Sequence, residues 1–170
     1  PGVALVGVQG ELCDAATLTI GENLRGAERL GAIWEGLEAF VGSRLVCRAA
    51  IEGPSLGSTH REFDLGEASG VARAWVWIHY RIEPVVVPPL TLKKYANRAT
   101  SKEEVIRYVV SRSRRDVDGD DAADAAVLAW IAHDLLTSRC PPSRGQAEVL
   151  QTLRAPSALK RKARRQGPNF

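Results

Sequence analysis

The stretch DGDDAADAAVLAWIAHDLL, residues 118–136, decides the fold class expected for this chain. Its apolar residues recur at helical spacing, and its acids gather at the start, where side-chain oxygens cap the free amides of a helix. Asp121 and Asp124 are three residues apart, so both carboxylates point to one side of the first helical turn. Together they could hold a divalent metal. The buried residues of this helix should be Ala125, Leu128, Ala129, Ala132 and Leu135.

Acids at a helix start also have an ordinary structural role, because they cap the helix and interact favourably with its dipole. This role stays open for Asp121 and Asp124. A calcium-binding EF-hand is excluded, because its loop needs Gly at the sixth position and a bidentate acid at the twelfth. Counted from Asp116, Gly119 is fourth and Val127 is twelfth.

A third acid, Glu52, follows the apolar run LVCRAAI, residues 45–51. A nearly continuous apolar run is typical of a central strand that is covered on both faces. Such a strand would deliver Glu52 to the same place as the helical acids. Carboxylates brought together from distant segments suggest a nuclease, because Mg²⁺ prefers hard oxygen ligands.

Periodicity predicts the first half of the chain in more detail. Residues 3–8 and 12–20 have the composition of two strands joined as a hairpin. Residues 24–41 repeat their apolar side chains every three or four positions, which indicates an amphipathic helix across the sheet with Trp34 in the core. Residues 63–80 also fit a helix, in which Gly66 and Gly70 would allow close approach to another backbone.

The second half carries two sharp local signals. Residues 85–87 predict a short buried strand, which Pro88-Pro89 should stop because proline continues neither a ladder nor a helix easily. Ser101 and Glu104 form a capping box, so a helix should begin there and bury Val105, Ile106 and Val109.

Composition predicts one domain and a tail. The 170 residues, 45% of them hydrophobic, suffice for one core. We expect a compact domain over residues 1–142 and a basic, partly disordered tail over residues 143–170, where seven Lys or Arg face one Glu. No apolar stretch approaches the roughly 20 residues that cross a bilayer, and no signal peptide is visible, so we expect a cytoplasmic protein without a membrane partner. Three widely separated cysteines favour neither a disulfide framework nor a zinc site: Cys13, Cys47 and Cys140.

Any binding of DNA must use local basic patches, because the body outside the tail carries a net negative charge. The best candidates are Lys93, Lys94, Arg98 and Lys102, followed by Arg61 and by the group Arg112, Arg114 and Arg115. A solvated surface position would equally account for each of these side chains.

Four motifs in order carry a family resemblance: Glu52-Gly-Pro, then LGEASG at residues 65–70, VPPLTLKKYANRATSKEEV at 87–105 and DDAADAAVLA at 120–129. Over residues 2–136 the chain resembles the RuvC family of Holliday-junction resolvases, in particular its phage-like branch. The resemblance implies an α/β, RNase H-like fold with a mixed central sheet and helices on both faces. It also implies a homodimer with a four-carboxylate site that binds two Mg²⁺, for which Mn²⁺ substitutes, and that cuts a four-way DNA junction symmetrically.

Four positions match the family pattern. Glu52 matches the acid that ends a core strand, Asp121 and Asp124 match the two C-terminal acids, and Lys93 matches a lysine beside the metals. The fourth acid of the family, on its first strand, has no match. Because residues 1–6 resemble the second strand of the family, we expect the Asp-bearing strand upstream of Pro1. Glu67 is left outside the metal set.

The expected activity is therefore that of a magnesium-dependent crossover junction endodeoxyribonuclease in the cytoplasm of a bacterium or of a phage-infected cell. The sequence does not identify a branch-migration helicase as partner. Two alternatives stay open. One is an inactive junction-binding protein of the same fold, and the other is an RNase H-like nuclease that acts on flaps or RNA–DNA hybrids.

Overall fold

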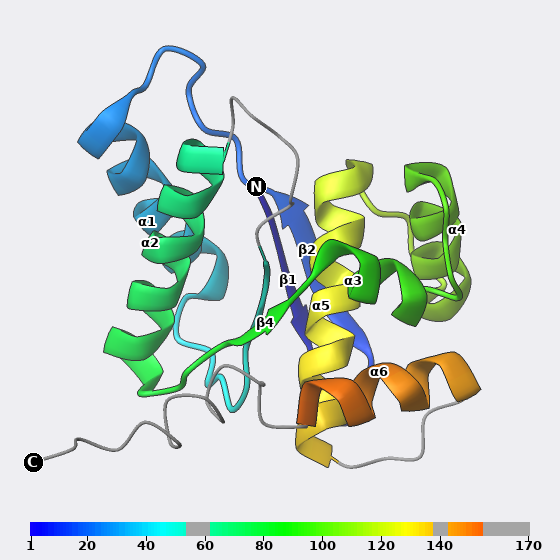
Figure 1. Cartoon of the computed structure of the whole chain (residues 1–170). Coiled ribbons are helices and arrows are strands. Elements are labelled where there is room, and N and C mark those ends of the chain that lie inside the picture. Colours follow the sequence, from blue (N-terminus) through cyan, green and yellow to red (C-terminus); the bar gives the residue numbers. More distant parts are fainter. Residues whose placement is uncertain (54–61, 138–142, 155–170) are drawn as a thin grey trace, which may run out of the picture.

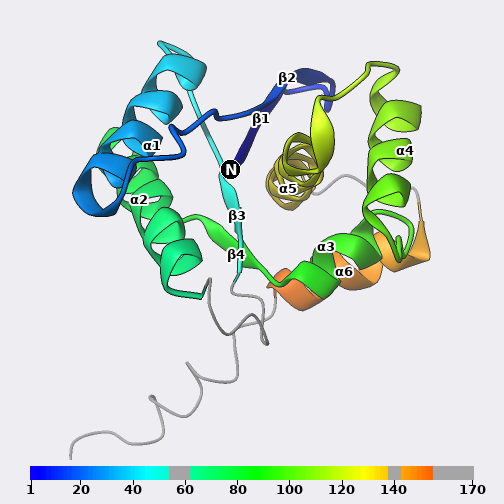
Figure 2. The same cartoon turned by 90° about the horizontal axis from the view of Figure 1, so that it is seen from above.

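The structure is a computed structural model that describes residues 1–53, 62–137 and 143–154. Its elements in order are β1 (Gly2–Val6), β2 (Leu12–Thr17), α1 (Gly26–Val41), β3 (Ala50–Glu52), α2 (Glu62–Tyr80), β4 (Val85–Val87), α3 (Pro89–Tyr95), α4 (Lys102–Ser113), α5 (Gly119–Thr137) and α6 (Arg144–Arg154). Figure 1 shows α5 surrounded by the β1–β2 hairpin, α3, α4 and α6. Figure 2 shows α1 and α2 packed together on the other side of the strands. Helices thus lie on both sides of the strands, as expected.

The predicted hairpin is confirmed, since β1 and β2 pair antiparallel along their length. Gly10 lies in the turn with a φ of +90°, a conformation that favours glycine. Its amide donates to the Gly7 carbonyl at 2.9 Å, and its own carbonyl accepts the indole N–H of Trp130 at 3.0 Å. The turn is therefore fastened to α5.

The expected single mixed sheet is not formed by the residues that the structure describes. They form two separate two-stranded sheets, antiparallel β1–β2 and parallel β3–β4. The strand expected over residues 45–51 is also wrong at its start, because only Ala50–Glu52 pairs and Leu45 is 91% exposed. The length of the pairing is limited by the partner strand β4. It has three residues between Pro84 and Pro88, and proline cannot donate to a ladder.

The predicted helices α1 and α2 pack on each other through aromatic side chains. Trp75 of α2 is 3% exposed and stacks on His79 with ring centroids 4.7 Å apart. Trp34 of α1 lies 5.8 Å from the same His79 ring and is half-buried, so it belongs to this small cluster rather than to the main core.

Helix α3 was not predicted. Pro88 ends β4 as expected, but Pro89 is the first residue of α3. A proline at the first helical position has no amide to lose and its fixed φ suits a helix start. Leu92 and Tyr95 of α3 are buried in the main core.

Helix α5 is buried on more than one side. The predicted inward residues Ala125 and Ala132 are buried, whereas Leu128, Ala129 and Leu135 are only partly so. Several residues outside that stripe are fully buried, among them Ala122, Ala123, Ala126, Val127, Trp130 and Ile131. The reason is that strands contact α5 as well as helices. At the closest approach, a Cβ on Gly2 of β1 would lie 1.8 Å from the Asp121 carbonyl oxygen, so only glycine fits there.

Arg112, which the sequence grouped with possible DNA contacts, lies instead in a buried polar network. Its guanidinium donates to the hydroxyls of Tyr95 and Tyr108 at 3.1 and 2.8 Å, and lies 4.4 Å from the centroid of the Trp130 ring. Its Nη2 is 3.8 Å from the carboxylate of Asp134, which also accepts a hydrogen bond from Tyr95. The network joins α3, α4 and α5. Arg112 is therefore a structural residue.

Helix α6 extends the folded body past the expected boundary at Pro142. Val149 and Leu150 are 1% and 2% exposed and belong to the main core. Gln146 donates to the Tyr108 hydroxyl at 2.7 Å. The first part of the expected tail is thus a packed helix, and residues 155–170 lie outside the described residues.

The first prediction concerns Arg112. We expect Arg112→Ala to lower the free energy of unfolding by about 3–5 kcal/mol, because it removes the guanidinium charge from the buried Asp134 carboxylate, which keeps its contacts with Tyr95 and His133. Urea denaturation followed by circular dichroism measures this. Arg107→Ala on the same helix is the control: its side chain is 74% exposed, so its effect should stay within about 0.5 kcal/mol. Equal effects of the two substitutions would contradict the structural role.

Candidate metal and nucleic-acid site

The parallel pairing of β3 and β4 brings two predicted site residues to one edge. Glu52, the last residue of β3, pairs with Val87, the last residue of β4. The Gly53 amide continues the pairing with a 2.8 Å bond to the Val87 carbonyl. Because β4 leads directly into α3, the end of β3 and the start of α3 lie at the same edge, and Lys93 belongs to α3.

The other two predicted site residues, Asp121 and Asp124, lie on helix α5. It begins at Gly119, whose φ of +86° favours glycine. Asp121 lies in the first turn with its side chain 54% exposed. Asp124 follows one turn later and is half-buried. Helix α5 also contacts β3, and the charges of Asp121 and Asp124 near its start act on Glu52 at the end of that strand.

The carboxyl groups at this edge influence one another. Loss of surrounding water raises the pKa of Glu52, and the nearby charges of Asp124 and Asp121 raise it further, while Lys93 lowers it. The pKa of Asp124 is raised by burial first and then by Asp120 and Asp121, with Lys102 and Lys93 acting in the opposite direction. The structure therefore gathers the four predicted catalytic residues, Glu52, Lys93, Asp121 and Asp124, into one electrostatically coupled group.

Asp120 was overlooked in the sequence. Its carboxylate accepts a hydrogen bond from the ammonium group of Lys102, which is the first residue of α4. This bond lowers the pKa of Asp120 and raises that of Lys102. The two residues are 18 positions apart, and no spacing rule pairs them. Lys102, predicted to contact DNA, is thus also a cation beside the acidic group.

The chemistry of the donors fits a hard divalent cation. All three predicted ligands are carboxylates, and the raised pKa values of Glu52 and Asp124 mean that a cation placed between them would relieve repulsion. Among the described residues, however, no three acidic, His or Cys side chains are close enough to hold a metal ion as they stand. The three ligands would have to draw together, or be joined by another acid, to bind one.

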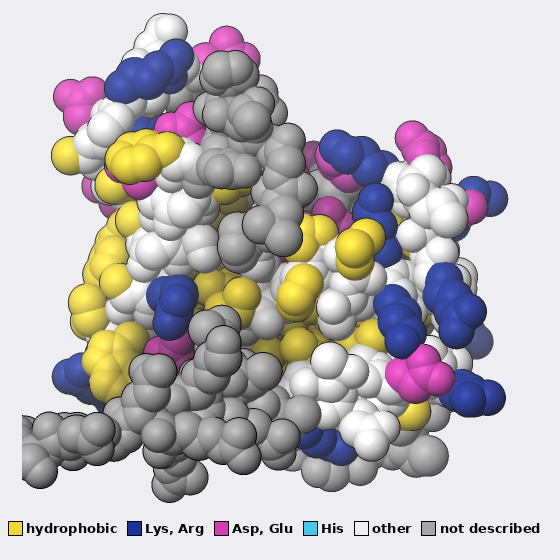
Figure 3. Space-filling view, in the orientation of Figure 1, with side chains coloured by type: hydrophobic (Ala, Val, Ile, Leu, Met, Phe, Trp, Pro, Cys, Tyr) yellow, Lys and Arg dark blue, Asp and Glu magenta, His cyan; other side chains and the backbone are white. Residues whose placement is uncertain are grey.

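The predicted DNA-binding residues differ in their surroundings. Lys94 forms a 2.8 Å ion pair with Glu148 of α6, which gives it a structural role. Arg98 is exposed and follows Asn97, both with φ near +60°, an uncommon conformation for residues other than glycine. Arg61 lies outside the described residues. Figure 3 shows Lys and Arg side chains gathered on the half of this face that holds α3, α4 and α6.

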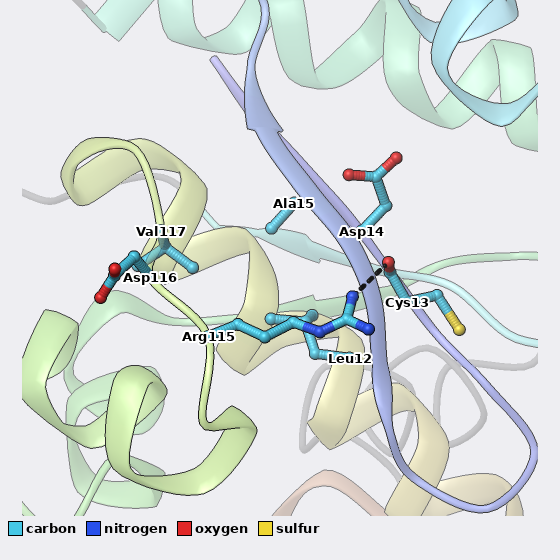
Figure 4. Close-up of a pocket in the computed structure, with 7 residues that line it drawn as sticks. All are labelled: Leu12, Cys13, Asp14, Ala15, Arg115, Asp116 and Val117. Atoms are coloured by element: carbon cyan, nitrogen blue, oxygen red, sulfur yellow. Dashed lines mark hydrogen bonds between the residues drawn. The ribbon is translucent and has the colours of Figure 1, made fainter.

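A shallow pocket lies elsewhere, between β2 and the segment that precedes α5 (Figure 4). Arg115 reaches across and donates to the Cys13 carbonyl at 3.1 Å. The lining residues include none of the predicted catalytic ones: Leu12, Cys13, Asp14, Ala15, Arg115, Asp116 and Val117. Cys13 and Cys47 are exposed free thiols, and Cys140 lies outside the described residues.

Comparison with known proteins identifies the fold. No protein-family model matches the chain, and no curated protein matches it. Among solved structures, the chain is similar to one described as the Thermus thermophilus RuvC structure, with a TM-score of 0.65. The fold is RuvC-like. The match covers 84% of this chain and 91% of that chain at 18% sequence identity, so it shows the RuvC-like fold alone. The expected α/β class is confirmed at this level, and the phage-like branch stays a prediction.

In the described part of the chain, no helix is both long enough and apolar enough to span a membrane.

The second prediction follows from the raised pKa of Asp124. At pH 7 its carboxylate is charged in a place that disfavours the charge, although solvent screens a half-buried group. Asp124→Asn should therefore stabilise the metal-free protein by about 1 kcal/mol, or about 2–4 °C in Tm. The gain should vanish below roughly pH 4, where the wild-type carboxyl is protonated in both the folded and the unfolded state.

Thermal unfolding in a chelator, at neutral and acidic pH, checks this prediction. Asp116→Asn, at an exposed position before α5, is the matched control and should leave Tm unchanged. A lower Tm for Asp124→Asn at pH 7 would mean that the Asp124 charge stabilises the fold instead.

Proposed function

We propose that this chain is a magnesium-dependent endonuclease that cuts Holliday junctions or related branched DNA in the cytoplasm of a bacterium or of a phage-infected cell. The observation that carries the proposal is the coupled group of Glu52, Asp121 and Asp124 with Lys93, built from β3, α5 and α3 of a RuvC-like fold. Such a group is costly to assemble for stability alone, because its charges repel one another.

Glu52, Asp121 and Asp124 are the proposed ligands of Mg²⁺, or of Mn²⁺ in its place. Bound there, two divalent ions would supply an activated water and stabilise both the attacked phosphate and the departing oxygen.

Lys93 has a separate proposed role. Its ammonium group lies close enough to Glu52 and Asp124 to lower the pKa of both. A positive charge there would face the scissile phosphate, where negative charge builds up in the transition state. Lys102 would add a second cation near the same phosphate, and Arg98 is free to contact the DNA backbone farther away.

We further propose that the active form is a homodimer, since two equal cuts require two sites related by a two-fold axis. A substrate panel tests the proposed function: a four-way junction, a flap, a duplex and an RNA–DNA hybrid of the same sequence, each with Mg²⁺. Preferred cutting of the junction supports the proposal. Preferred cutting of the flap or the hybrid points to another nuclease of this fold, and tight junction binding without cutting points to an inactive junction-binding protein.

The third prediction concerns the acids. Glu52→Gln and Asp124→Asn should each reduce junction cleavage in Mg²⁺ by at least about a thousandfold, the order expected when a metal-ion mechanism loses a ligand. Junction affinity measured in Ca²⁺ should be retained, because the acids do not attract DNA. Glu67→Gln is the control acid, since it lies outside the proposed ligand set. A Glu52→Gln or Asp124→Asn enzyme that cuts at nearly the wild-type rate would contradict the assignment.

The fourth prediction separates neighbouring lysines on α3. Lys93→Ala should slow the single-turnover cleavage step by about a hundredfold or more and change junction affinity little, because its charge acts mainly in the transition state. Lys94→Ala should have a small effect on both, since Lys94 pairs with Glu148 instead. Equal and small losses in the two variants would reduce Lys93 to one member of a basic surface.

A further inference from the structure

The ion pair between Lys102 and Asp120 joins the starts of two helices. Lys102 is the first residue of α4 and Asp120 lies in the first turn of α5, and these helices pack side by side (Figure 1). The Lys102 ammonium group donates a hydrogen bond to the Asp120 carboxylate. The charges of Asp121 and Asp124 also act on Lys102, so the pair lies beside the coupled acidic group. Asp120 has no part in the proposed chemistry.

Helix stability does not account for a lysine at the start of α4. A helix N-terminus carries a partial positive charge, so a cation in the first turn is unfavourable. The start of α4 is stabilised by other residues: the Ser101 hydroxyl accepts from the Glu104 amide at 3.3 Å, and the Glu104 carboxylate accepts from the Thr100 amide at 2.6 Å. This capping box fixes the backbone around Lys102 and leaves its side chain 71% exposed. A partner is therefore needed to hold the ammonium group in one place.

Asp120 increases the repulsion among the carboxylates unless it is paired. After burial, its charge is the largest cause of the raised pKa of Asp124. Asp120 does not complete a metal site as it stands, because no three acidic, His or Cys side chains are suitably grouped among the described residues. The hydrogen bond from Lys102 lowers the pKa of Asp120, so its carboxylate stays charged. The position of Asp120 is thus explained by its contact with Lys102.

Loss of the Asp120 charge would redirect Lys102. Its ammonium group has three donors on a flexible stem and binds any acceptor within reach. The acids that remain near it are Asp121 and Asp124, whose charges already act on it. An ammonium group bound to either of them would lie where a metal ion should bind. The metal would then have to break that contact first.

We propose that Asp120 is a positioning residue, whose carboxylate holds the Lys102 ammonium group beside the acidic group and away from the metal ligands Asp121 and Asp124. Lys102 thereby stays available for the phosphate, and the two ligands stay available for the metal. The identity of these ligands rests on the proposed function, whereas the pairing of Lys102 with Asp120 rests on their hydrogen bond.

Binding of Mn²⁺ to the whole chain without DNA, followed by electron paramagnetic resonance, tests this role independently of cleavage. Asp120→Asn should raise the Mn²⁺ dissociation constant by roughly tenfold or more, because the metal must displace Lys102 from a charge-assisted bond to a ligand. Asp120→Glu retains the carboxylate and should bind Mn²⁺ nearly as the wild type does.

Asp118→Asn is the matched control. It also removes an acid near the start of α5, and Asp118 is exposed. Its dissociation constant for Mn²⁺ should change by less than about threefold, because water and salt screen an exposed charge. Equal losses of affinity in the Asp118→Asn and Asp120→Asn variants would overturn the proposal.

The Lys102→Met substitution distinguishes positioning from direct ligation. In a chain that carries it, adding Asp120→Asn should weaken Mn²⁺ binding by less than about threefold, because no ammonium group remains to be redirected. A direct ligand would lose the same affinity with or without Lys102. A tenfold loss in both backgrounds would therefore overturn the proposal and make Asp120 a metal ligand.

The pairing itself is tested in the metal-free protein. The nuclear magnetic resonance signal of the Lys102 Nζ should shift on Asp120→Asn and stay in place on Asp118→Asn. An unchanged signal in the Asp120→Asn variant would exclude the pair. A wild-type protein that binds no Mn²⁺ but shows this shift would refute the metal site of the proposed function and leave the pair standing.

Discussion

The burial of α5 is the constraint on which the rest of the structure depends. Strands contact this helix on one side and α3, α4 and α6 on others, so much of its surface must be small or apolar. Alanines at 122, 123 and 126 meet that need, and Gly2 meets it from the side of β1. The buried carboxylate of Asp134 lies in the network around Arg112 and Tyr95. The first turn of α5 is open to water and holds Asp121, and Asp124 follows one turn later.

The site therefore depends on how α5 is held. Its N-terminal acids face the end of β3, whose short ladder is limited by prolines at both ends of β4. The pKa values of Glu52 and Asp124 are raised because burial and neighbouring carboxylates disfavour their charged forms. Lys93 on α3 lowers both pKa values in part, and Lys102 on α4 lowers that of Asp124. The local charge balance is thus set by four segments that are distant in sequence.

Strong periodicity and local capping could be predicted from the sequence, and long-range packing could not. The hairpin, α1, α2 and α4 follow from alternation, three-and-four spacing and the Ser101 cap, which the Glu104 amide confirms. Helix α3 was missed because Pro89 was taken only as a stop. Arg112 was misassigned because a run of basic residues does not reveal which one faces Tyr95 and Trp130. The site acids were predicted from their order along the chain, whereas the pairing of Lys102 with Asp120 could be seen only in the fold.

The ion pair between Lys94 and Glu148 has a consequence for how short this protein can be made. It joins α3, the helix that carries Lys93, to α6. Val149 and Leu150 of α6 are buried in the main core. A version trimmed at Pro142, where the composition changes, would expose that apolar surface and release the support beneath Lys93. Engineered versions for crystallisation or for fusion to other proteins should accordingly retain the chain to Arg154.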